Sequence, residues 1–402
     1  MRLLHFLNSA HGGATSGTLE FIKYANDIND NVQHIILYPG HSKDLRFEKL
    51  QSENMVFIPL RYGWWNYTYR LNLIQRMVVR LKSNIMTFFG IIPLFQIFKI
   101  LKKYKVELIY TTSASVKLGK IASNIFNLPH IWHIKEEIGL GKFMQFPLSD
   151  EKLAKYIGSG ETKIICMSHY VSTLFSSNNI PYNVVHDGIN FDTINKEELI
   201  INRKVMRDSY GIKDSDILIG MVSAPVSQIK RHELFIKAIS HLSQDNLKFI
   251  VFGSIPAKGH PSFEYFNELN TLIDSYPRLK EKFIWAGNKF NFSDIYSGLD
   301  LFVHTCEVEG FGRVVIEAMV CGVPVITPDK GGAAEINNTE NSGLRFKSND
   351  ASSLMEKIDL MVNQEELRKR FIESGRIHAE LNFSVKKHYN EIMKIIRNYG
   401  KN

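Results

Sequence analysis

The segment "HTCEVEGFGRVVIEAMVCGVPVITPDKGGAAE", residues 304–335, indicates the fold class most clearly. The apolar run at 301–305 predicts a buried strand, and "RVVIEAMVC" predicts a helix that begins just after Gly312. A second buried strand, "PVITP", follows Gly322 at 324–328. A strand, a helix and a strand in succession predict a parallel β-α-β unit, and such units bind ligands beyond the carboxyl ends of their strands.

The same alternation of strands and helices runs through both halves of the chain. Several strand candidates are apolar at consecutive positions, which is typical of strands buried on both faces. They are 2–6, 32–38, 55–59, 106–112, 130–134 and 163–168, then 216–222, 247–253, 282–287, 301–305 and 324–328. A polar segment near 190–205 separates the two series. We therefore predict an α/β fold with domains at 1–195 and 205–375, and a last helix within 376–402 that packs back on the first domain.

The composition is that of an ordinary folded protein. With 402 residues, 44% of them apolar and 22% charged, the chain has enough length for two cores. The net charge of +8 favours an anionic partner, and three cysteines without framework spacing indicate a reducing compartment. The most apolar span, 84–98, is too short for a membrane-spanning helix and contains Pro93. The start reads as a strand and not as a signal peptide.

Glu309 stands just before the predicted helix and Glu317 stands on it. A helix N-terminus presents unpaired N–H groups that suit a phosphate, and Gly310 and Gly312 allow close approach of the backbone. Glu317 would lie roughly 7.5 Å along the helix axis. Two carboxylates on either side of a diphosphate could accept hydrogen bonds from the hydroxyls of a sugar nucleotide. For either glutamate alone, the alternative is a solvated residue or a partner of the helix dipole.

The run "EGFGRVVIEAMVCGVPVIT", 309–327, resembles the E-x7-E signature of the retaining glycosyltransferases of family 4. The resemblance implies the GT-B fold, in which two Rossmann-like domains with parallel sheets face a central cleft. It is strongest over 215–350 and looser over 1–180. Further pieces that follow the order of the family are 186–190, 296–305, 327–336 with Glu335, and 341–346.

The resemblance assigns roles to the residues of this signature. Glu309 is expected to contact the transferred sugar as a catalytic residue, and Glu317 to bind the ribose hydroxyls of the nucleotide. The loop between them would hold the donor at Gly310, Phe311 and Gly312. Retention of configuration is expected by front-face attack, in which the leaving phosphate takes the proton of the acceptor.

Lys230 matches the family's lysine that contacts the donor diphosphate, and we expect it to stabilise the charge that grows there. The arginine that should precede it is replaced by Ala224 or Pro225, which departs from the family pattern. Either Arg231 or a residue elsewhere in the chain would then supply the second charge, or backbone N–H groups would hold more of the diphosphate. No metal and no other cofactor is expected, because the only D-x-D, at 214–216, precedes a strand and indicates a turn.

Three further candidates lie in the first half. Gly12 and Gly13 open the first helix and would lie near the donor phosphates or the acceptor, although a plain strand-to-helix turn is the alternative. The G-x-G-x-x-G spacing of a dinucleotide site is absent there. By resemblance, His133 would lie near the transferred sugar and the acceptor. The alternative for this residue is a purely structural role. Weaker histidine candidates are His11, His186 and His304.

Residues 54–106 contain no acidic residue but nine basic ones, interleaved with tryptophan, tyrosine and phenylalanine. This pattern predicts peripheral attachment through residues 61–105 to an anionic membrane surface, on the cytoplasmic side of the plasma membrane. A solvated helix face is the alternative. We expect no nucleic-acid partner, since no binding motif is present.

The sequence as a whole favours a glycosyltransferase that moves a sugar from a nucleotide sugar, expected to be UDP-linked, to a lipid-linked or cell-surface glycan. One alternative is the same chemistry on a soluble acceptor, as in sucrose or glycogen synthesis. A second is a nucleotide-sugar-binding partner without catalysis, which the missing arginine makes conceivable. An epimerase is disfavoured because the two-glutamate signature belongs to the transferases.

Overall fold

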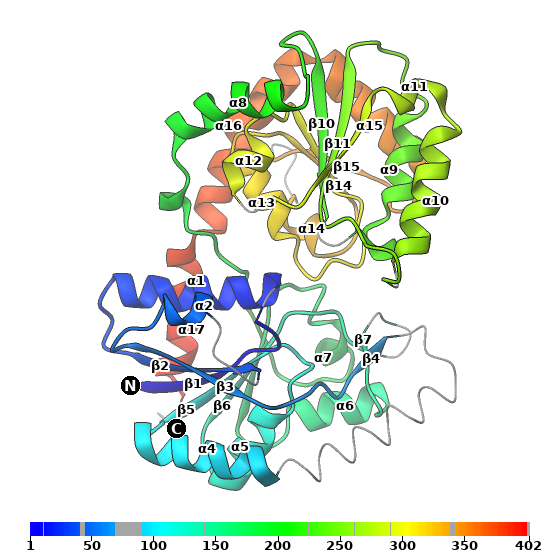
Figure 1. Cartoon of the computed structure of the whole chain (residues 1–402). Helices are drawn as coiled ribbons and strands as arrows, with labels where there is room; N and C mark the ends of the chain where they lie inside the picture. The colour runs from blue at the N-terminus through cyan, green and yellow to red at the C-terminus, as the bar shows by residue number, and fades with distance from the viewer. Residues whose placement is uncertain are drawn as a thin grey trace. The chain divides into compact units, whose positions relative to one another are not determined.

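In the computed structural model, the chain folds into two compact units (Figure 1). The first unit contains Met1–Ile189 and Val385–Asn402, and the second contains Asn190–Ser384. The structure describes residues 1–10, 12–40, 45–68, 91–139, 142, 144–223, 226–260, 262–289, 291–337 and 342–399. Most of the basic aromatic stretch, 69–90, lies outside the described residues.

The first unit is built on a parallel sheet with the strand order β3-β2-β1-β5-β6-β8-β9. Its strands are β1 Arg2–Phe6, β2 Gln33–Pro39, β3 Met55–Leu60, β5 Leu108–Thr112, β6 His130–Ile134, β8 Thr162–Cys166 and β9 Asn183–Val184. The short strands β4 Tyr67–Thr68 and β7 Met144–Gln145 pair separately and antiparallel. Its helices are α1 Gly13–Asp27, α2 Leu45–Glu48, α4 Ile91–Tyr104, α5 Leu118–Phe126, α6 Asp150–Ile157, α7 Thr173–Ser177 and α17 Val385–Arg397. All six strands expected in this half are present.

The two faces of this sheet carry two cores, because successive side chains of a strand point to opposite sides. Leu3 belongs to the core under α1 and α17, and Leu4 to the core under α4 and α5. The last helix, α17, packs on α1, where the rings of Phe21 and Tyr389 lie 5.6 Å apart (Figure 1). The Tyr389 hydroxyl also bonds to Asp30. The C-terminal segment is thus part of the first unit.

The second unit is built on a parallel sheet with the order β12-β11-β10-β13-β14-β15. Its strands are β10 Ile217–Val222, β11 Leu247–Phe252, β12 Phe283–Gly287, β13 Leu301–Val303, β14 Val325–Pro328 and β15 Leu344–Phe346. The helices before β13 are η1 Phe191–Thr193, α8 Lys196–Ser209, η2 Gln228–Lys230, α9 His232–Ile239, α10 Phe263–Asp274, α11 Pro277–Lys280 and α12 Phe292–Tyr296. Those after it are α13 Arg313–Val320, α14 Gly332–Ile336, α15 Ala351–Asn363 and α16 Glu365–Asn382. Only β9 and β15 were not expected in the two sheets, because each is too short to show an apolar run.

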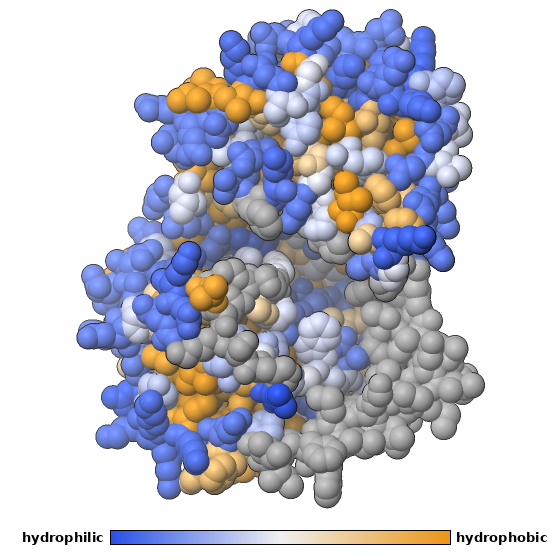
Figure 2. Space-filling view, viewed as in Figure 1, coloured by the Kyte–Doolittle hydropathy of each residue, from blue (hydrophilic) through white to orange (hydrophobic). Residues whose placement is uncertain are grey.

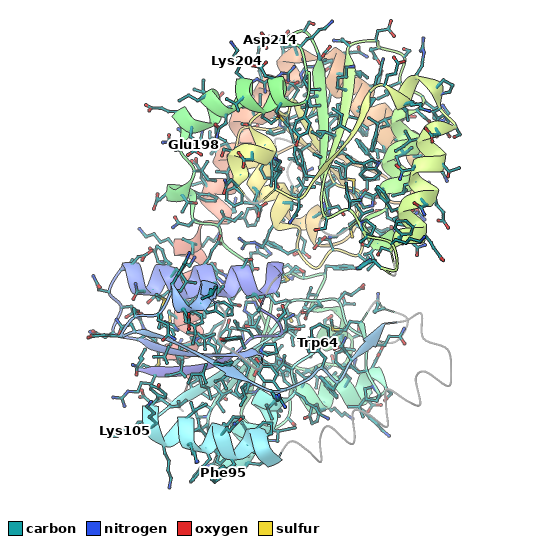
Figure 3. The ribbon with its side chains drawn as sticks, viewed as in Figure 1. Trp64, Phe95, Lys105, Glu198, Lys204 and Asp214 are labelled. Carbon is teal, nitrogen blue, oxygen red and sulfur yellow. The ribbon has the colours of Figure 1, made fainter. Side chains whose placement is uncertain are left out.

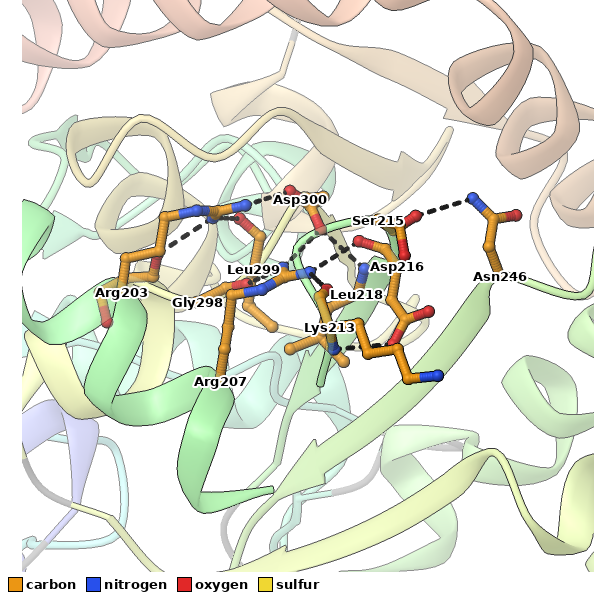
Figure 4. A network of polar contacts seen from close by, with 11 residues as sticks. Arg203, Arg207, Lys213, Ser215, Asp216, Leu218, Asn246, Gly298, Leu299 and Asp300 are labelled. Carbon is orange, nitrogen blue, oxygen red and sulfur yellow. Dashed lines mark hydrogen bonds and ion pairs between the residues drawn. The ribbon is translucent and has the colours of Figure 1, made fainter. Parts of the chain in front are cut away.

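The second unit begins at Asn190 and not at 205, because α8 is anchored to it by an ionic network (Figure 4). Arg207 is only 2% exposed, and its guanidinium lies 2.9 Å from Asp300 Oδ2. Arg203 contacts the other oxygen of the same carboxylate at 2.6 Å. Asp216 accepts a bond from the backbone N–H of Lys213 at 2.8 Å, so this aspartate shapes the turn before β10, as the sequence predicts.

The outer face of α8 is apolar. Ile200, Ile201 and Val205 are 75%, 66% and 61% exposed, and Figure 2 shows apolar residues gathered over this helix. These side chains do not contribute to the core of the second unit, which explains why the segment reads as a polar linker with scattered aliphatic residues. Separately, none of the described helices combines the length and the apolar character that a membrane crossing requires.

Candidate active site

The candidate site lies at the carboxyl ends of β10 and β13, in the middle of the second sheet. The strand order runs outward from β10 on one side and from β13 on the other, so this is the switch point at which open α/β sheets bind ligands. Lys230 ends η2 after β10, and Glu309 lies in the loop between β13 and α13. Two residues that the sequence analysis singled out therefore lie in the connections that follow the two central strands.

Lys230 and Glu309 form an ion pair between Nζ and Oε2. Each side chain is 25% exposed, so the pair is partly covered but open to solvent on one side. The hydroxyl of Thr305 donates to the backbone carbonyl of Lys230 at 2.6 Å, which holds the turn of η2 against the end of β13. The structure thus brings together the ammonium expected to meet a diphosphate and the carboxylate expected to meet a sugar.

Each member of the pair keeps the other charged. Burial opposes the charge on Lys230, but the carboxylate of Glu309 and the nearby Cys306 raise the pKa of the lysine above its ordinary value. Burial also opposes the charge on Glu309, but Lys230 and His304 bring the pKa of this carboxyl below its ordinary value. Both groups are therefore ionised at neutral pH, and an anionic ligand would find a cation at this position.

His304 is the third polar side chain of the site, and the sequence ranks it only as a weak candidate. Its Nε2 lies 4.0 Å from Glu309 Oε2, and the residue is 1% exposed. Burial lowers the pKa of His304 to about 4, so its imidazole is neutral at pH 7. Within the described part of the chain Nε2 has no hydrogen-bond partner. A buried polar atom left unpaired is costly, but at 1% exposure a ligand hydroxyl could reach this nitrogen only after a rearrangement.

The loop that carries Glu309 is held by the Gly-Gly segment that the sequence analysis singled out. Gly331 has φ +82°, and a Cβ there would lie 2.3 Å from the carbonyl oxygen of Glu307. A Cβ on Gly332 would lie 2.3 Å from the carbonyl oxygen of Gly310. The N–H of Gly332 donates to the carbonyl of Glu309 at 2.9 Å. Two backbones meet here without side chains between them, and this contact places the Glu309 loop.

The other residues of the loop have separate tasks. Gly312 caps α13 with φ +98°, a conformation that glycine adopts at little cost. Phe311 is 1% exposed, and its ring lies 5.7 Å from that of Phe383. Its side chain therefore anchors the loop, and only its backbone remains for the donor contact that the sequence predicts. Gly310 is half-buried beside the Gly-Gly segment.

Glu317 lies on α13, half-buried, and accepts a bond from the hydroxyl of Tyr296 at 2.9 Å. Burial, together with the negative charge of Glu317, raises the pKa of Tyr296 well above its ordinary value. The phenol stays protonated and therefore fixes one carboxylate oxygen of Glu317. Tyr296 was not among the predicted site residues, although it is the first residue of the family-like segment 296–305, because nothing in the local sequence shows that its hydroxyl reaches α13.

Arg231, the candidate for the missing diphosphate arginine, is held by other residues. Its backbone is left-handed, with φ +56°, and its Nε lies 2.6 Å from Glu233 Oε1. Its guanidinium also donates to the side chain of Asn349. The predicted departure at Ala224 and Pro225 lies outside the described residues, so the role of Arg231 stays a prediction.

The remaining candidates lie in the first unit. Gly12 starts α1 with φ +103°, whereas a Cβ on Gly13 would meet nothing within 4 Å. His133 is 1% exposed, and its Nδ1 lies 2.6 Å from the hydroxyl of Tyr110. Burial, with the positive charge of Lys135 second, lowers the pKa of His133 well below its ordinary value. An imidazole so covered would need a rearrangement to touch a substrate, and its catalytic role stays a prediction. His186 also belongs to this unit, and His11 lies outside the described residues.

His304, Cys306 and Glu309 place three potential ligand atoms within 4.8 Å of one another. The ammonium of Lys230 already sits on the carboxylate of Glu309, where a cation would bind. Burial raises the pKa of Cys306 to about 12, so without a bound cation its thiol is protonated at neutral pH. The cluster is built around the lysine.

Residues 202–378 match the family model described as glycosyl transferases group 1. An uncharacterized glycosyltransferase of Methanocaldococcus jannaschii is 26% identical over 319 residues, which are 77% of this chain and 82% of that protein. A Campylobacter jejuni enzyme is 28% identical over 182 residues, 45% of this chain and 46% of that protein. Its name is N-acetylgalactosamine-N,N'-diacetylbacillosaminyl-diphospho-undecaprenol 4-alpha-N-acetylgalactosaminyltransferase.

Solved structures share the fold over the whole chain. A glycosyltransferase from Rickettsia africae superposes with a TM-score of 0.77 at 22% identity, covering 100% of this chain and 99% of that one. The HepE protein of Anabaena, solved in complex with UDP, superposes with a TM-score of 0.76 at 17% identity, covering 99% and 100%. The expected arrangement of two Rossmann-like α/β units with parallel sheets is confirmed as the GT-B fold.

Proposed function

We propose that this chain, which is a glycosyltransferase of the GT-B fold, moves a sugar from a UDP-linked donor to a lipid-linked or cell-surface glycan. The transfer retains the anomeric configuration and needs no metal ion. The observation that carries the proposal is the Lys230–Glu309 ion pair at the switch point of the second sheet, beside the N-terminus of α13.

The ion pair explains how the site would accept a donor. When a nucleotide sugar binds, its diphosphate takes the ammonium of Lys230, and the carboxylate of Glu309 becomes available to the sugar hydroxyls. The first N–H groups of α13 add partial positive charge. The neutral imidazole of His304 completes the polar wall around Glu309.

The chemistry follows from where charge grows. The bond between the anomeric carbon and the diphosphate oxygen breaks while the acceptor oxygen bonds to that carbon on the same face. The leaving phosphate oxygen takes the proton of the acceptor hydroxyl. Lys230 and the α13 N-terminus stabilise the negative charge on the diphosphate, which is the electrostatic contribution that usually dominates. A metal ion would compete with Lys230 for the same position.

The nucleotide is assigned to the part of the site that contains Glu317. Tyr296 orients the carboxylate of Glu317. Glu317 lies further along α13 than the proposed position of the diphosphate, and the ribose of a nucleotide likewise lies beyond its phosphates. UDP is proposed because the Anabaena protein of the same fold was solved with UDP. The assignment of Glu317 to the ribose hydroxyls comes from the family resemblance.

A lipid-linked acceptor is proposed from two observations. The Campylobacter relative is named for a diphospho-undecaprenol acceptor. Helix α4 also displays Phe95, 59% exposed, with the ammonium of Lys99 4.5 Å from its ring centre, and Lys102 lies 4.4 Å from the ring centre of Phe98. Aromatic rings and basic groups on one helix suit an anionic bilayer surface. We therefore place the enzyme peripherally on the cytoplasmic face of the plasma membrane.

The proposal is tested by binding and by product stereochemistry. Calorimetry with UDP and with UDP-glucose, UDP-galactose and their N-acetylated forms should show binding that excess EDTA does not weaken. Slow hydrolysis of the bound donor, followed by proton NMR, should release the α anomer first. Early release of the β anomer would reject retention, loss of binding with EDTA would reject metal independence, and absence of UDP binding would reject the donor assignment.

A further inference from the structure

Trp64 and Trp65 are adjacent in sequence but have opposite environments. Trp65 is 5% exposed, packs against the rings of Phe146 and Tyr156 at 4.8 and 5.3 Å, and donates its Nε1–H to the carbonyl of Ala114 at 2.8 Å. Trp64 is 58% exposed (Figure 3). Because the buried Trp65 is anchored in the core, the backbone of its neighbour Trp64 is fixed as well.

The exposed indole is also held by its own polar atom. Trp64 Nε1–H donates to the backbone carbonyl of Asn8 at 2.7 Å. A surface tryptophan whose N–H is satisfied by the main chain presents its apolar ring to solvent in a fixed orientation. Such a ring offers a rigid contact area that loses little conformational entropy when a ligand covers it.

Trp64 borders a hollow of about 350 Å³ in the first unit. The residues around it follow the carboxyl ends of β1, β2 and β3, the side on which parallel sheets bind ligands. Tyr62 ties this rim together, because its hydroxyl contacts the carbonyls of Leu7 at 2.5 Å and Leu37 at 2.9 Å. The other lining residues are Asn8, Ser9, Ala10, Pro39 and Gly63.

The wall of the hollow next to the indole is polar and ordered. The hydroxyl of Thr15 lies 3.3 Å from Asn8 Oδ1 and 2.9 Å from the backbone carbonyl of Ser9. The hydroxyl of Ser9 lies 3.4 Å from the same Asn8 oxygen. These contacts orient the Asn8 amide plane. An apolar ring face with a few fixed polar groups beside it is the usual make-up of a small-molecule site.

We propose that Trp64 and Asn8 form a subsite for a pyranose ring of the acceptor glycan. The C–H face of the sugar covers the indole of Trp64, and the hydroxyls at the ring edge bond to Asn8 and Ser9. A pyranose has this same combination of an apolar face and a polar edge. The inference rests on the proposed function, since it requires a carbohydrate acceptor, and it removes Trp64 from the expected membrane-contacting residues.

The experiment is saturation-transfer NMR on the full chain with methyl α-glucoside, methyl α-galactoside and their N-acetylated forms as probes. In the wild type, at least one probe should receive saturation mainly on the protons of one ring face. Trp64→Ala should weaken this binding about tenfold, about 1.4 kcal/mol, whereas Trp64→Phe should retain part of it. Phe95→Ala is the matched control, because Phe95 is 59% exposed on α4 of the same unit and should leave sugar binding unchanged (Figure 3).

Two further measurements separate the possible failures. UDP binding measured by calorimetry should be equal in the wild type and in both Trp64 variants. If the wild type does not bind UDP, the donor proposal is rejected and the subsite is not. Sedimentation with anionic vesicles should be weakened by Phe95→Ala and not by Trp64→Ala. The subsite is wrong if a wild type that binds UDP gives no ring-face saturation with any probe, if Trp64→Ala keeps wild-type sugar binding, or if it loses only vesicle binding.

Discussion

Lys230 and Glu309 are 79 residues apart in the chain, and their side chains form an ion pair at the switch point of the second sheet. Each charge is partly buried and is stabilised by the other. Removing one partner leaves the other as an uncompensated charge in a partly buried place. The pair is therefore both a structural contact between the two loops and a charged contact that an anionic ligand would change, and the two roles can be separated by mutation.

Glu309→Gln should lose transfer while keeping UDP affinity. The amide has nearly the shape of the carboxylate, but it cannot make the charge-assisted bonds to the sugar, which contribute about 1.5–3 kcal/mol each. Turnover with the natural acceptor, or donor hydrolysis, should fall roughly 10- to 100-fold or more. Glu307→Gln, a change in the same loop, is the control and should stay close to the wild type. Undiminished turnover by Glu309→Gln would remove Glu309 from the catalytic residues.

Lys230→Ala should weaken UDP binding more than Glu309→Gln does. The variant loses the ammonium that the diphosphate needs, and it leaves Glu309 as an unpaired anion that repels phosphate. Calorimetry should show roughly a 10- to 100-fold weaker affinity. Lys237→Ala, on the exposed side of α9, serves as the control. Equal UDP affinity in Lys230→Ala and the wild type would place the diphosphate elsewhere.

Tyr296→Phe should weaken nucleotide binding. The ring keeps its packing, but Glu317 loses the donor that orients one carboxylate oxygen. A hydrogen bond to a carboxylate contributes about 1.5–3 kcal/mol, and because Tyr296 acts on the ligand only through Glu317, affinity for UDP should fall by a part of this, about 2- to 10-fold. The deoxyribose analogues of UDP distinguish the cause, because they should bind the wild type and Tyr296→Phe more nearly alike. If UDP and its deoxy analogues lost affinity equally in the variant, Tyr296 would not act through the ribose contact.

Gly332→Ala should disturb the Glu309 loop. The added Cβ would stand 2.3 Å from the carbonyl oxygen of Gly310 and 2.5 Å from Cα of Phe311, so one backbone must move. Overpacking typically lowers the free energy of unfolding by about 1–3 kcal/mol. A lowered thermal midpoint and reduced turnover are therefore expected together. Gly13→Ala is the matched control for stability, since a Cβ there meets nothing within 4 Å. It should be neutral or slightly stabilising, and a wild-type midpoint for Gly332→Ala would contradict the close approach.

Replacing Lys99, Lys102 and Lys103 of α4 with glutamate should abolish sedimentation with anionic vesicles and leave UDP affinity unchanged. Each basic residue near an anionic surface contributes about 1 kcal/mol. Binding of the wild type should also weaken with salt, as the Debye length falls from about 10 Å at 0.1 M to 3 Å at 1 M. Replacing the exposed Lys204, Lys237 and Lys258 of the second unit with glutamate changes the net charge equally and is the control. Equal loss in both triple variants would make the effect one of net charge and not of α4.

The order of elements and the position of the two-glutamate helix were predictable from the sequence. Buried parallel strands need consecutive apolar residues, and a helix that starts after Gly312 needs only the local pattern of 313–320. Glu309 and Glu317 could therefore be placed before and on α13 without knowledge of the rest of the chain. The expected strands β10 and β13 also put Lys230 and Glu309 at the same edge of a sheet.

The contacts between side chains could not be predicted from the sequence, because they depend on how distant segments pack. The contact of Lys230 with Glu309 depends on β10 and β13 being neighbours in the sheet, and strand order is not a local property of the chain. The same holds for Tyr296, whose hydroxyl reaches Glu317 only because α12 packs on α13. Trp64 and Trp65 show the limit most clearly, because no periodic pattern of a loop tells which of two adjacent indoles enters the core. Local sequence sets the backbone conformation, whereas burial and contact depend on distant segments that the fold brings together.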